Sequence, residues 1–263
     1  MTEILTSWSP ITIIFVFAVD INEKIRENRI VCIFCIKRIT MIEVNKIQKK
    51  YYNQSVLKDC SLMAKPGECI GIVGANGCGK TTLLSIMSGS LKASGGSIRY
   101  FGEEALGNPK VIQKYVGYVP QDNPLITELT VRDNLGLWYY GKKGDHAVQY
   151  VLQEFNLQEY ERKQVSKLSG GTRRRLSLAC ALINMPPILI MDEPCAAVDL
   201  ACKAQIHTYL QSYKSQKGTI IMSTHDESEL QMCDRIYFMD KGCLRQIEKS
   251  VNLEALILQT MQK

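Results

Sequence analysis

The feature that most constrains the fold is a glycine-rich segment at residues 74–81 with the sequence GANGCGKT. It matches the pattern G-x-x-x-x-G-K-[ST] of a phosphate-binding loop, in which the glycines let consecutive backbone N–H groups converge on phosphate oxygens. The apolar residues 69–73 (CIGIV) before it predict a strand, and residues 81–89 (TTLLSIMSG) after it predict a helix whose N-terminus is directed at the same anion. The alternative is a glycine-rich turn that matches the pattern by chance, and such a turn does not require a strand before it and a helix after it. The segment therefore predicts a P-loop at the edge of an α/β sheet.

Two side chains of this segment have specific expected roles. Lys80 is long enough to reach the β- and γ-phosphates of a nucleotide and is expected to act in catalysis, and the hydroxyl of Thr81 is expected to ligate Mg²⁺. Lys80 and Thr81 are also predicted to contact the nucleotide. The remaining predicted contacts in this segment are Gly74, Asn76, Gly77, Cys78, Gly79 and Thr82.

A second acidic element follows an apolar run. Residues 188–191 (ILIM) lead directly into Asp192 and Glu193. Because α/β sheets bind ligands at the carboxyl ends of their strands, Asp192 is expected to hold Mg²⁺ through a water molecule. Glu193 is then placed to orient and deprotonate an attacking water. Hydrolysis requires one carboxylate for the metal and one for the water, so this pair predicts a hydrolytic site. The alternative is that Asp192 and Glu193 lie in a surface turn.

From residue 41 onward the chain predicts alternating strands and helices. Strands are expected at 42–46, 60–64, 69–73, 97–100, 188–191, 219–223 and 235–240, and helical patterns dominate from about 131 to 158. Near-continuous apolar runs are typical of strands buried on both faces of a parallel sheet. We therefore expect the α/β class with a mainly parallel sheet.

Composition excludes several classes of protein. Of the 263 residues, 46% are hydrophobic and 22% are charged, which excludes intrinsic disorder of the chain as a whole. No apolar run reaches the roughly 18–20 residues of a membrane-spanning helix. The net charge of +6 indicates a solvated surface with a small basic excess, so nucleic acid is not expected as a partner. Residues 173–175, three consecutive arginines, are expected on a solvated helix face or in interfacial ion pairs.

The ten cysteines are predicted to be reduced. They lack the compact spacing of disulfide-rich secreted scaffolds, and several lie in apolar or glycine-rich segments. Cys32 and Cys35 form a C-x-x-C pair, but no second pair or histidine cluster in the sequence completes a zinc site. We therefore expect mostly buried thiols.

Residues 1–40 differ in character from the rest, with apolar stretches on either side of the charged segment DINEKIRENR. We expect a poorly ordered extension, with the functional domain beginning at Met41. The alternative is an accessory hairpin or helix that docks on the core.

Between the two phosphate-site elements lies Leu168-Ser169-Gly170-Gly171-Thr172, followed by a helical run. With this segment the chain resembles the nucleotide-binding (ATPase) subunit of an ATP-binding cassette transporter, over about residues 42–244. LSGGT resembles the family signature LSGGQ, with Thr172 in place of the usual glutamine. Residues 118–121 (YVPQ) resemble the Q-loop, residues 195–199 (CAAVD) occupy the D-loop position, and residues 223–226 (STHD) resemble the switch-histidine segment.

The resemblance implies a P-loop NTPase core with a mainly parallel sheet, a small antiparallel β subdomain and an inserted α-helical subdomain. The expected boundaries are an N-terminal extension at 1–40 and a cassette domain at 41–263, with its core at 41–121 and 177–263 and its helical subdomain at about 122–176.

The resemblance also implies roles for single residues, and ATP with Mg²⁺ as the bound groups. Gln121 is expected to contact the metal or the attacking water, and His225 to donate a hydrogen bond to the γ-phosphate and act in catalysis. Tyr51 lies where an aromatic ring stacks on adenine, with neighbouring Tyr52 as the alternative. Asp199 is expected to contribute from the subunit interface.

In this family the signature segment faces the P-loop of another subunit. Ser169, Gly170 and Gly171 are therefore expected to contact ATP held by a second copy of the chain or by a homologous ATPase subunit. Ala196 replaces a hydroxyl residue common in the D-loop, which removes one cross-subunit hydrogen bond. Because Lys80, Asp192 and the other catalytic positions match, we expect active hydrolysis.

The function implied is that of an ATPase subunit that powers transport, with an exporter of the multidrug type expected. Its expected place is cytoplasmic, peripheral on the inner face of the cell membrane, bound to membrane-spanning permease subunits whose cytoplasmic helix enters a groove near residues 121–137. One alternative is a soluble ATP-binding cassette ATPase acting on ribosomes or DNA. Another is a small P-loop kinase, which would leave LSGG and His225 without a role.

Overall fold

The computed structural model describes residues 41–251, apart from residues 53, 123, 142–145 and 197, together with residue 256. All of these belong to one of the chain's two units, Thr40–Lys263. The extension expected at residues 1–40 lies outside the described residues, and the proposed domain boundaries stay a prediction.

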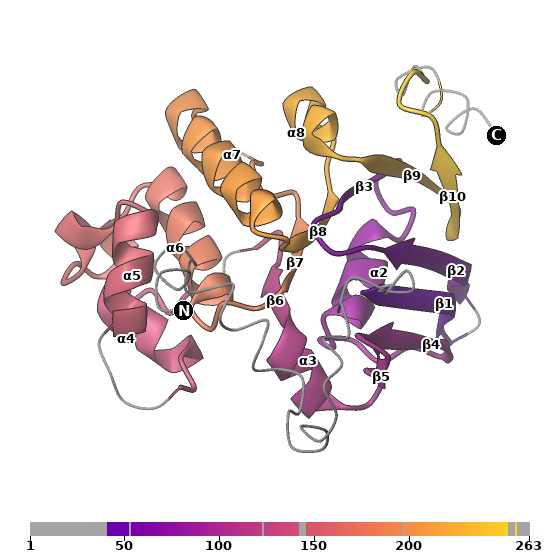
Figure 1. The fold of residues 1–263 in the computed structure, drawn as a ribbon, viewed down its shortest axis with the longest axis horizontal. Coiled ribbons are helices and arrows are strands. Elements are labelled where there is room, and N and C mark those ends of the chain that lie inside the picture. Colours follow the sequence, from indigo (N-terminus) through magenta and orange to yellow (C-terminus); the bar gives the residue numbers. More distant parts are fainter. Residues whose placement is uncertain are drawn as a thin grey trace, which may run out of the picture. The chain divides into compact units, whose positions relative to one another are not determined.

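A six-stranded sheet forms the centre of the described unit (Figure 1). Its spatial order is β10-β9-β3-β8-β7-β6, in which β9, β3, β8, β7 and β6 run parallel and β10 pairs antiparallel with β9. Every residue of β3, β7 and β8 is buried, as their apolar runs require in a sheet covered on both faces. The mainly parallel sheet is therefore confirmed. The strand bounds are β3 (Cys69–Val73), β6 (Val116–Val119), β7 (Ile188–Asp192), β8 (Thr219–Ser223), β9 (Arg235–Asp240) and β10 (Cys243–Ile247).

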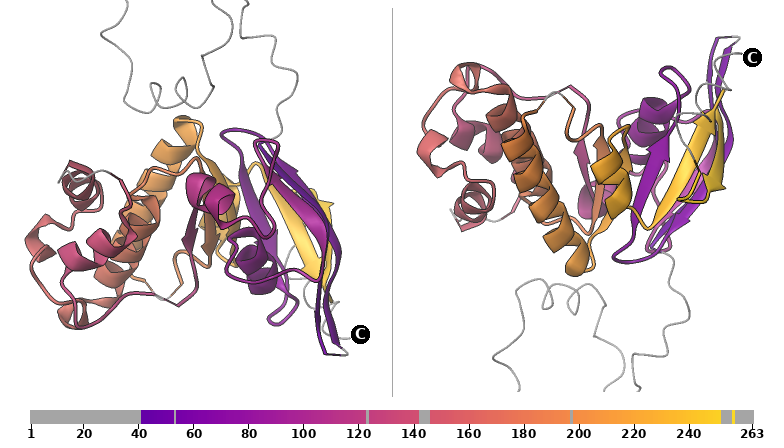
Figure 2. Two further views of the ribbon diagram at one scale, coloured as in Figure 1. Left: turned by 90° about the horizontal axis from the view of Figure 1, so that it is seen from below. Right: turned by 90° about the horizontal axis from the view of Figure 1, so that it is seen from above.

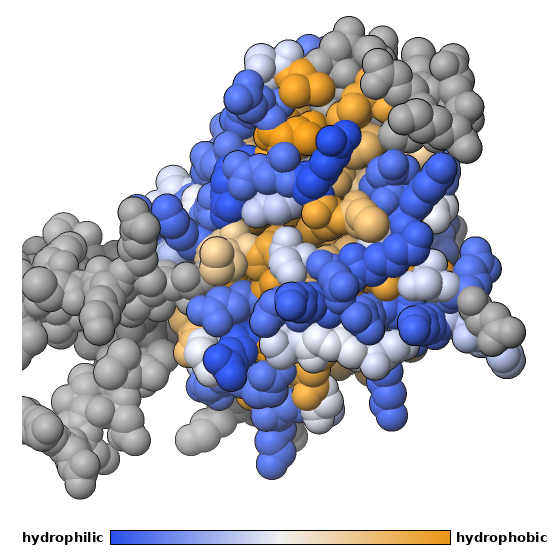
Figure 3. All heavy atoms as spheres, turned by 90° about the vertical axis from the view of Figure 1, so that its right-hand side faces the viewer, coloured by the Kyte–Doolittle hydropathy of each residue, from blue (hydrophilic) through white to orange (hydrophobic). Residues whose placement is uncertain are grey.

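A second, antiparallel sheet has the order β2-β1-β4-β5. Its strands are β1 (Ile42–Tyr51), β2 (Gln54–Ala64), β4 (Gly95–Tyr100) and β5 (Glu103–Glu104). The hairpin of β1 and β2 is longer than the two strands predicted there, because register shifts let the pairing continue as far as Tyr51 and Gln54. Buried and exposed residues alternate at the end of β2, and the side of the molecule that carries this sheet is mostly hydrophilic with hydrophobic side chains between (Figure 3).

Alternate residues of the parallel strands pack into two separate cores. In β3, Ile70 and Ile72 belong to one core and Cys69 and Val73 to the other, because successive side chains of a strand point to opposite faces. The first core includes buried residues of α2 (Lys80–Met87) and of the antiparallel sheet. The second includes buried residues of α6 (Gly170–Leu182) and α7 (Leu200–Ser215). Helix α2 therefore lies on one face of the six-stranded sheet, and α6 and α7 lie on the opposite face (Figure 2).

Helices α4 (Val131–Trp138), α5 (His146–Glu154) and α6 gather at one end of the unit (Figure 1). Helix α4 begins with a capping box formed by Thr130 and Asp133, and its buried residues Val131 and Leu135 are one helical turn apart. The remaining helical elements are α3 (Pro109–Tyr115), η1 (Gln158–Tyr160), η2 (Val165–Lys167) and α8 (Glu227–Met232). The P-loop NTPase core with an antiparallel β part and an inserted helical part is thereby confirmed. No helix in the described ranges combines the length and the apolar character needed to cross a bilayer.

Gly117→Ala is expected to lower the free energy of unfolding by about 1–3 kcal/mol. In β6 the new Cβ would lie 2.4 Å from the carbonyl oxygen of Ala181, in the backbone of α6. Gly136 in α4 is the matched control, since no atom outside its own helical backbone lies within 4 Å of the corresponding position. Gly136→Ala should therefore raise the free energy of unfolding by up to about 1 kcal/mol. Urea unfolding of the full chain measures both, and equal effects would contradict the close packing of β6 on α6.

Candidate functional site

The P-loop connects the carboxyl end of β3 to the first residue of α2. Gly74 follows β3 directly, and a Cβ there would lie 2.2 Å from the carbonyl oxygen of Met239 in β9, so no side chain fits. Gly79 precedes α2 with φ 114, a backbone conformation that favours glycine. The two glycines thus let the loop pass close to β9 and then turn sharply into the helix.

Lys80 begins α2 and is buried, with 6% of its surface exposed. Its Nζ donates to the carbonyl oxygens of Gly74 at 2.6 Å and Ala75 at 3.2 Å. The ammonium group therefore lies inside the loop, beside the backbone N–H groups of the helix N-terminus. Together they form a positively polarised cradle suited to an anion. Thr81, Asn76 and Gly77 are exposed around it and Thr82 is half-buried.

Asp192, the last residue of β7, is almost fully buried, with 1% exposed. Its Oδ1 accepts a hydrogen bond from the hydroxyl of Ser223 at the end of β8, whereas Oδ2 has no hydrogen-bond partner among the described residues. A buried carboxylate oxygen without a partner is costly unless a cation or an ordered water meets it. This oxygen therefore fits the predicted role of Asp192 toward Mg²⁺ through a water molecule.

Glu193 lies between two other predicted site residues. Gln121, in the loop after β6, donates from Nε2 to Glu193 Oε2 at 3.1 Å. His225, in the loop after β8, has its Nε2 3.9 Å from Glu193 Oε1. The backbone N–H of Glu193 donates to the carbonyl oxygen and to the hydroxyl of Ser223. Three loops at the carboxyl edge of the parallel sheet thus bring the predicted catalytic side chains together.

The electrostatics of this edge keep His225 neutral near pH 7. Burial and the positive charge of Lys80 lower the pKa of His225 below its ordinary value of 6.5, and the nearby Glu193 only partly opposes them. A neutral imidazole has one N–H donor and one acceptor nitrogen. It can therefore donate one hydrogen bond without bringing a full positive charge into the site.

Arg174 of α6 was not expected here: residues 173–175 were predicted on a solvated helix face or in interfacial ion pairs, and for Arg174 the solvated face is wrong. It is buried with 3% exposed. Its guanidinium donates to the carbonyl oxygens of Pro120, Gln121, Asp192, Glu193 and Pro194, at distances from 2.7 to 3.3 Å. One cation thus holds the loops after β6 and after β7 against each other. Arg173 and Arg175, on either side of it, are partly exposed.

Helical spacing was the signal that could have found this residue. Arg174 lies three residues after Gly171 and four before Leu178, both of which are buried. Residues three and four apart share one face of a helix, so Arg174 belongs to the buried face of α6. The run of three arginines concealed this, because a charge run is usually solvated.

The signature segment begins α6, as the resemblance implies. Ser169 is the N-cap residue, and its hydroxyl accepts a hydrogen bond from the backbone N–H of Thr172 at 3.2 Å. Ser169 and Gly170 are exposed. Asp199 similarly caps α7 and accepts from the N–H of Cys202 at 2.8 Å. These residues lie on the α6–α7 side of the sheet, so the structure does not bring them to the P-loop of the same chain.

Tyr51 and Tyr52 end the hairpin strand β1 and its turn. Tyr51 is 43% exposed, and the ammonium of Lys49 lies 4.7 Å from the centre of its ring. Tyr52 is fully exposed. Both rings are accessible for stacking, and the choice between them stays a prediction.

His225→Gln is expected to flatten the pH dependence of stability between about pH 5.5 and 7.5. Because the pKa of His225 is lowered in the folded chain, the unfolded chain binds an additional proton as the pH falls below 6.5. The free energy of unfolding of the wild type therefore decreases as the pH falls through this interval, and that of the variant should decrease less. Urea unfolding at several pH values measures it. An unchanged slope in His225→Gln would contradict the lowered pKa of His225.

Comparison with known proteins agrees with this geometry. The family model described as ABC transporter matches residues 57–196. The spermidine/putrescine import ATP-binding protein PotA of Spiroplasma citri is 36% identical over 79% of this chain and 61% of its own length. The Nod factor export ATP-binding protein I of Paraburkholderia xenovorans (strain LB400) is 37% identical over 76% of this chain and 68% of its own length.

Solved structures give the same result. The dimeric ATP-binding cassette MJ0796 in a post-hydrolysis state, bound to ADP and Pi, is 26% identical, with a TM-score of 0.73 over 80% of this chain and 100% of that one. The match to the spermidine/putrescine relative spans about three fifths of that protein, 61% of its length. The resemblance seen in the sequence is confirmed: the chain belongs to the ABC transporter family, and its described residues form an ATP-binding cassette of that family.

Proposed function

We propose that this chain binds and hydrolyses ATP with Mg²⁺ and thereby powers an ABC transporter. The observation that carries the proposal is the position of Glu193, between Gln121 at 3.1 Å and His225 at 3.9 Å. This carboxylate stands next to the buried Asp192 at the sheet edge that carries the P-loop. A kinase would need an acceptor site there, whereas this arrangement serves a water molecule.

Each residue has a distinct part in the proposed reaction. The P-loop N–H groups and Lys80 hold the β- and γ-phosphates, and Glu193 accepts a proton from the attacking water. His225 donates to the γ-phosphate. Thr81, Asp192 and Gln121 are the residues that would hold Mg²⁺, which, when bound, neutralises charge on the phosphates.

The layers of the fold support a site shared between two copies. The P-loop and α2 belong to the core on one face of the six-stranded sheet, and the signature helix α6 belongs to the core on the other. One chain therefore cannot direct both at the same phosphate without breaking its sheet. In a two-fold dimer Ser169, Gly170 and Gly171 of one protomer, with Asp199 beside them, would face the P-loop of its partner. ATP then closes the dimer, and hydrolysis removes the contacts that favour closure.

A pocket between the core and the helical part supports docking to a membrane-spanning partner. It has a volume of about 750 Å³, and Gln121, Leu137, Trp138 and Tyr140 are among its lining residues. Leu137, Trp138 and Tyr140 are exposed large side chains, as a surface for an apolar helix requires. We place the permease's cytoplasmic helix here, so that the chain lies peripherally on the inner face of the membrane.

We further propose that the transporter exports its substrate. The expected exporter rests on the stretch from LSGGTRRRLSLACAL through the D-loop, and the named relatives include both an importer's and an exporter's ATP-binding protein. Export therefore stays a prediction.

Glu193→Gln should bind ATP with wild-type affinity, lower kcat by about 10²–10⁴-fold and accumulate as an ATP-bound dimer. The substitution keeps the size of the side chain and removes its basicity. Phosphate release and size-exclusion chromatography with ATP measure the two effects. Glu227→Gln, on the exposed side of α8, is the control that should keep wild-type turnover. Wild-type turnover in Glu193→Gln would contradict the role of this carboxylate.

Mixing two inactive variants should restore hydrolysis if each site is shared. Lys80→Ala removes the phosphate contact of the P-loop. Ser169→Asp keeps an N-cap residue for α6 and places a negative charge against the partner's γ-phosphate. Half of the dimers in an equal mixture are mixed, and each mixed dimer has one intact site of two, so about a quarter of wild-type activity should return.

Ser166→Asp is the control for the effect of a new negative charge near α6. Ser166 is exposed three residues before Ser169, and Ser166→Asp should leave activity unchanged. A mixture that stays as inactive as its components would contradict the shared site.

A further inference from the structure

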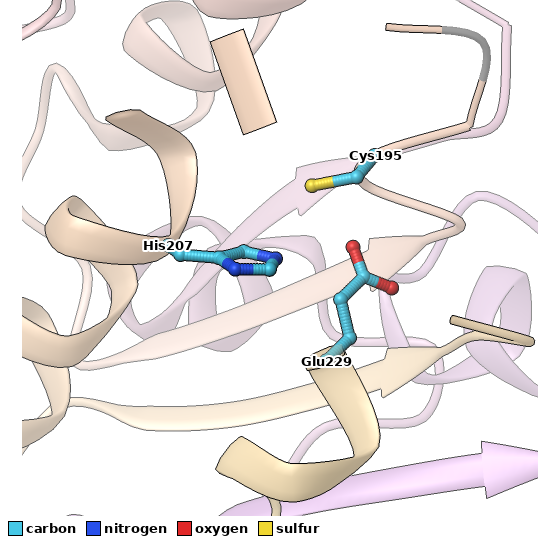
Figure 4. Close-up of side chains that lie close together, drawn as sticks. All are labelled: Cys195, His207 and Glu229. Atoms are coloured by element: carbon cyan, nitrogen blue, oxygen red, sulfur yellow. The ribbon is translucent and has the colours of Figure 1, made fainter. Parts of the chain in front are cut away.

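Three side chains outside the proposed ATP site converge behind it. Cys195 lies in the loop after β7, His207 in α7 and Glu229 in α8, and Figure 4 shows their side chains directed toward one another. One ligand atom of each lies within 4.8 Å of those of the other two. None of the three has a part in the proposed ATP reaction.

Two of the polar atoms in this cluster lack hydrogen-bond partners. Glu229 is buried with 1% exposed, and its Oε2 accepts from the hydroxyl of Thr224. Its Oε1 and the Nε2 of His207 are both buried without a partner of hydrogen-bond geometry among the described residues. A buried carboxylate oxygen left in this way costs stability, so the cluster has an unmet demand for a cation or a donor.

We propose that Cys195, His207 and Glu229 form a binding site for a divalent metal ion of the zinc class. A thiolate, an imidazole and a carboxylate are the ligand types that zinc takes, commonly with a fourth position for water. Zinc–ligand distances of about 2.0–2.3 Å place tetrahedral ligand atoms about 3.5 Å apart. Because the three atoms already lie within 4.8 Å of one another, small side-chain rotations suffice.

The charges around the cluster permit a cation. Burial and the nearby Glu229 raise the pKa of the Cys195 thiol, so an arriving ion displaces the thiol proton to solvent. Two cations adjoin the site and both are engaged elsewhere. Lys203 forms an ion pair with Asp226, and Arg174 donates to backbone carbonyls. The alternative is that Glu229 serves only as a counter-charge for Arg174 and as an acceptor for the thiol.

An ion at this site would join α7 to two segments that carry the proposed chemistry. Cys195 follows Glu193 by two residues, and α8 begins two residues after His225. A bound metal would therefore restrain the loop of the proposed base and the loop of the switch histidine relative to α7. The metal site itself stands independently of ATP hydrolysis.

The test is metal binding by the full chain, reduced and free of nucleotide, with Zn²⁺ and Co²⁺ as probes. Cys32→Ser with Cys35→Ser serves as the background, so that the C-x-x-C pair does not contribute. Competition with a chromophoric chelator should show one equivalent of Zn²⁺. Co²⁺ should give a thiolate-to-cobalt charge-transfer band together with tetrahedral visible bands. The thermal midpoint should rise with Zn²⁺.

Two of the three ligands, Cys195 and His207, have a matched control elsewhere in the chain. Cys195→Ser and His207→Gln should each weaken Zn²⁺ binding by more than about 100-fold. Cys195→Ser should also abolish the charge-transfer band, and His207→Gln should change the tetrahedral visible bands of Co²⁺. Cys243→Ser on β10 and His146→Gln on α5, both at exposed positions, should retain both signals.

Several results would overturn the proposal. One is the absence of a charge-transfer band in the background protein. Another is equal Zn²⁺ binding in Cys195→Ser and in Cys243→Ser, which would mean that the carboxylate is only a counter-charge. Thermal unfolding without metal confirms that each variant folds. Because no arm requires ATP, the outcome is separate from that of the proposed function.

Discussion

The arrangement of the proposed site depends on the buried guanidinium of Arg174. It donates to carbonyl oxygens of two loops, after β6 and after β7, and so holds Gln121 and Glu193 where their side chains hydrogen-bond. Carbonyl groups in buried loops lack partners once water is excluded, and a charged planar donor satisfies several of them at once. Since Arg174 belongs to α6, the helix that begins at the signature segment is linked directly to the proposed base.

The division of the fold into two cores has a comparable consequence. Strands that alternate their side chains between two faces necessarily separate the helix of the P-loop from the helix of the signature segment. In the proposed dimer, each chain would therefore contribute its P-loop to one ATP site and its signature segment to the other. The proposal of a shared ATP site rests on sheet geometry as much as on the motifs.

The metal ion proposed behind the site would link the same loops once more. Cys195, His207 and Glu229 come from the loop after β7, from α7 and from α8, and one ligand atom of each lies within 4.8 Å of those of the other two. The fold places a thiol, an imidazole and a carboxylate beside the loop of Glu193, and one oxygen of that carboxylate, Oε1 of Glu229, has no hydrogen-bond partner among the described residues. The proposed metal site would therefore restrain the same loops that carry the proposed ATPase residues, although its own ligands are different residues.

The sequence alone determined the family, the fold class and the order of the motifs, because each motif needs particular residues at fixed spacing between a strand and a helix. It did not locate Arg174 in the interior, and it placed Cys195 only as part of a loop beside the site. The separation of Arg174 from its carbonyl partners is 18 to 54 residues, and Cys195 and Glu229 are equally remote in the chain. Helical spacing can assign Arg174 to the buried face of α6, but it does not show which carbonyl groups lie opposite. Only the tertiary structure decides that, because it depends on which strands become neighbours, and local periodicity carries no information about the partner across the fold.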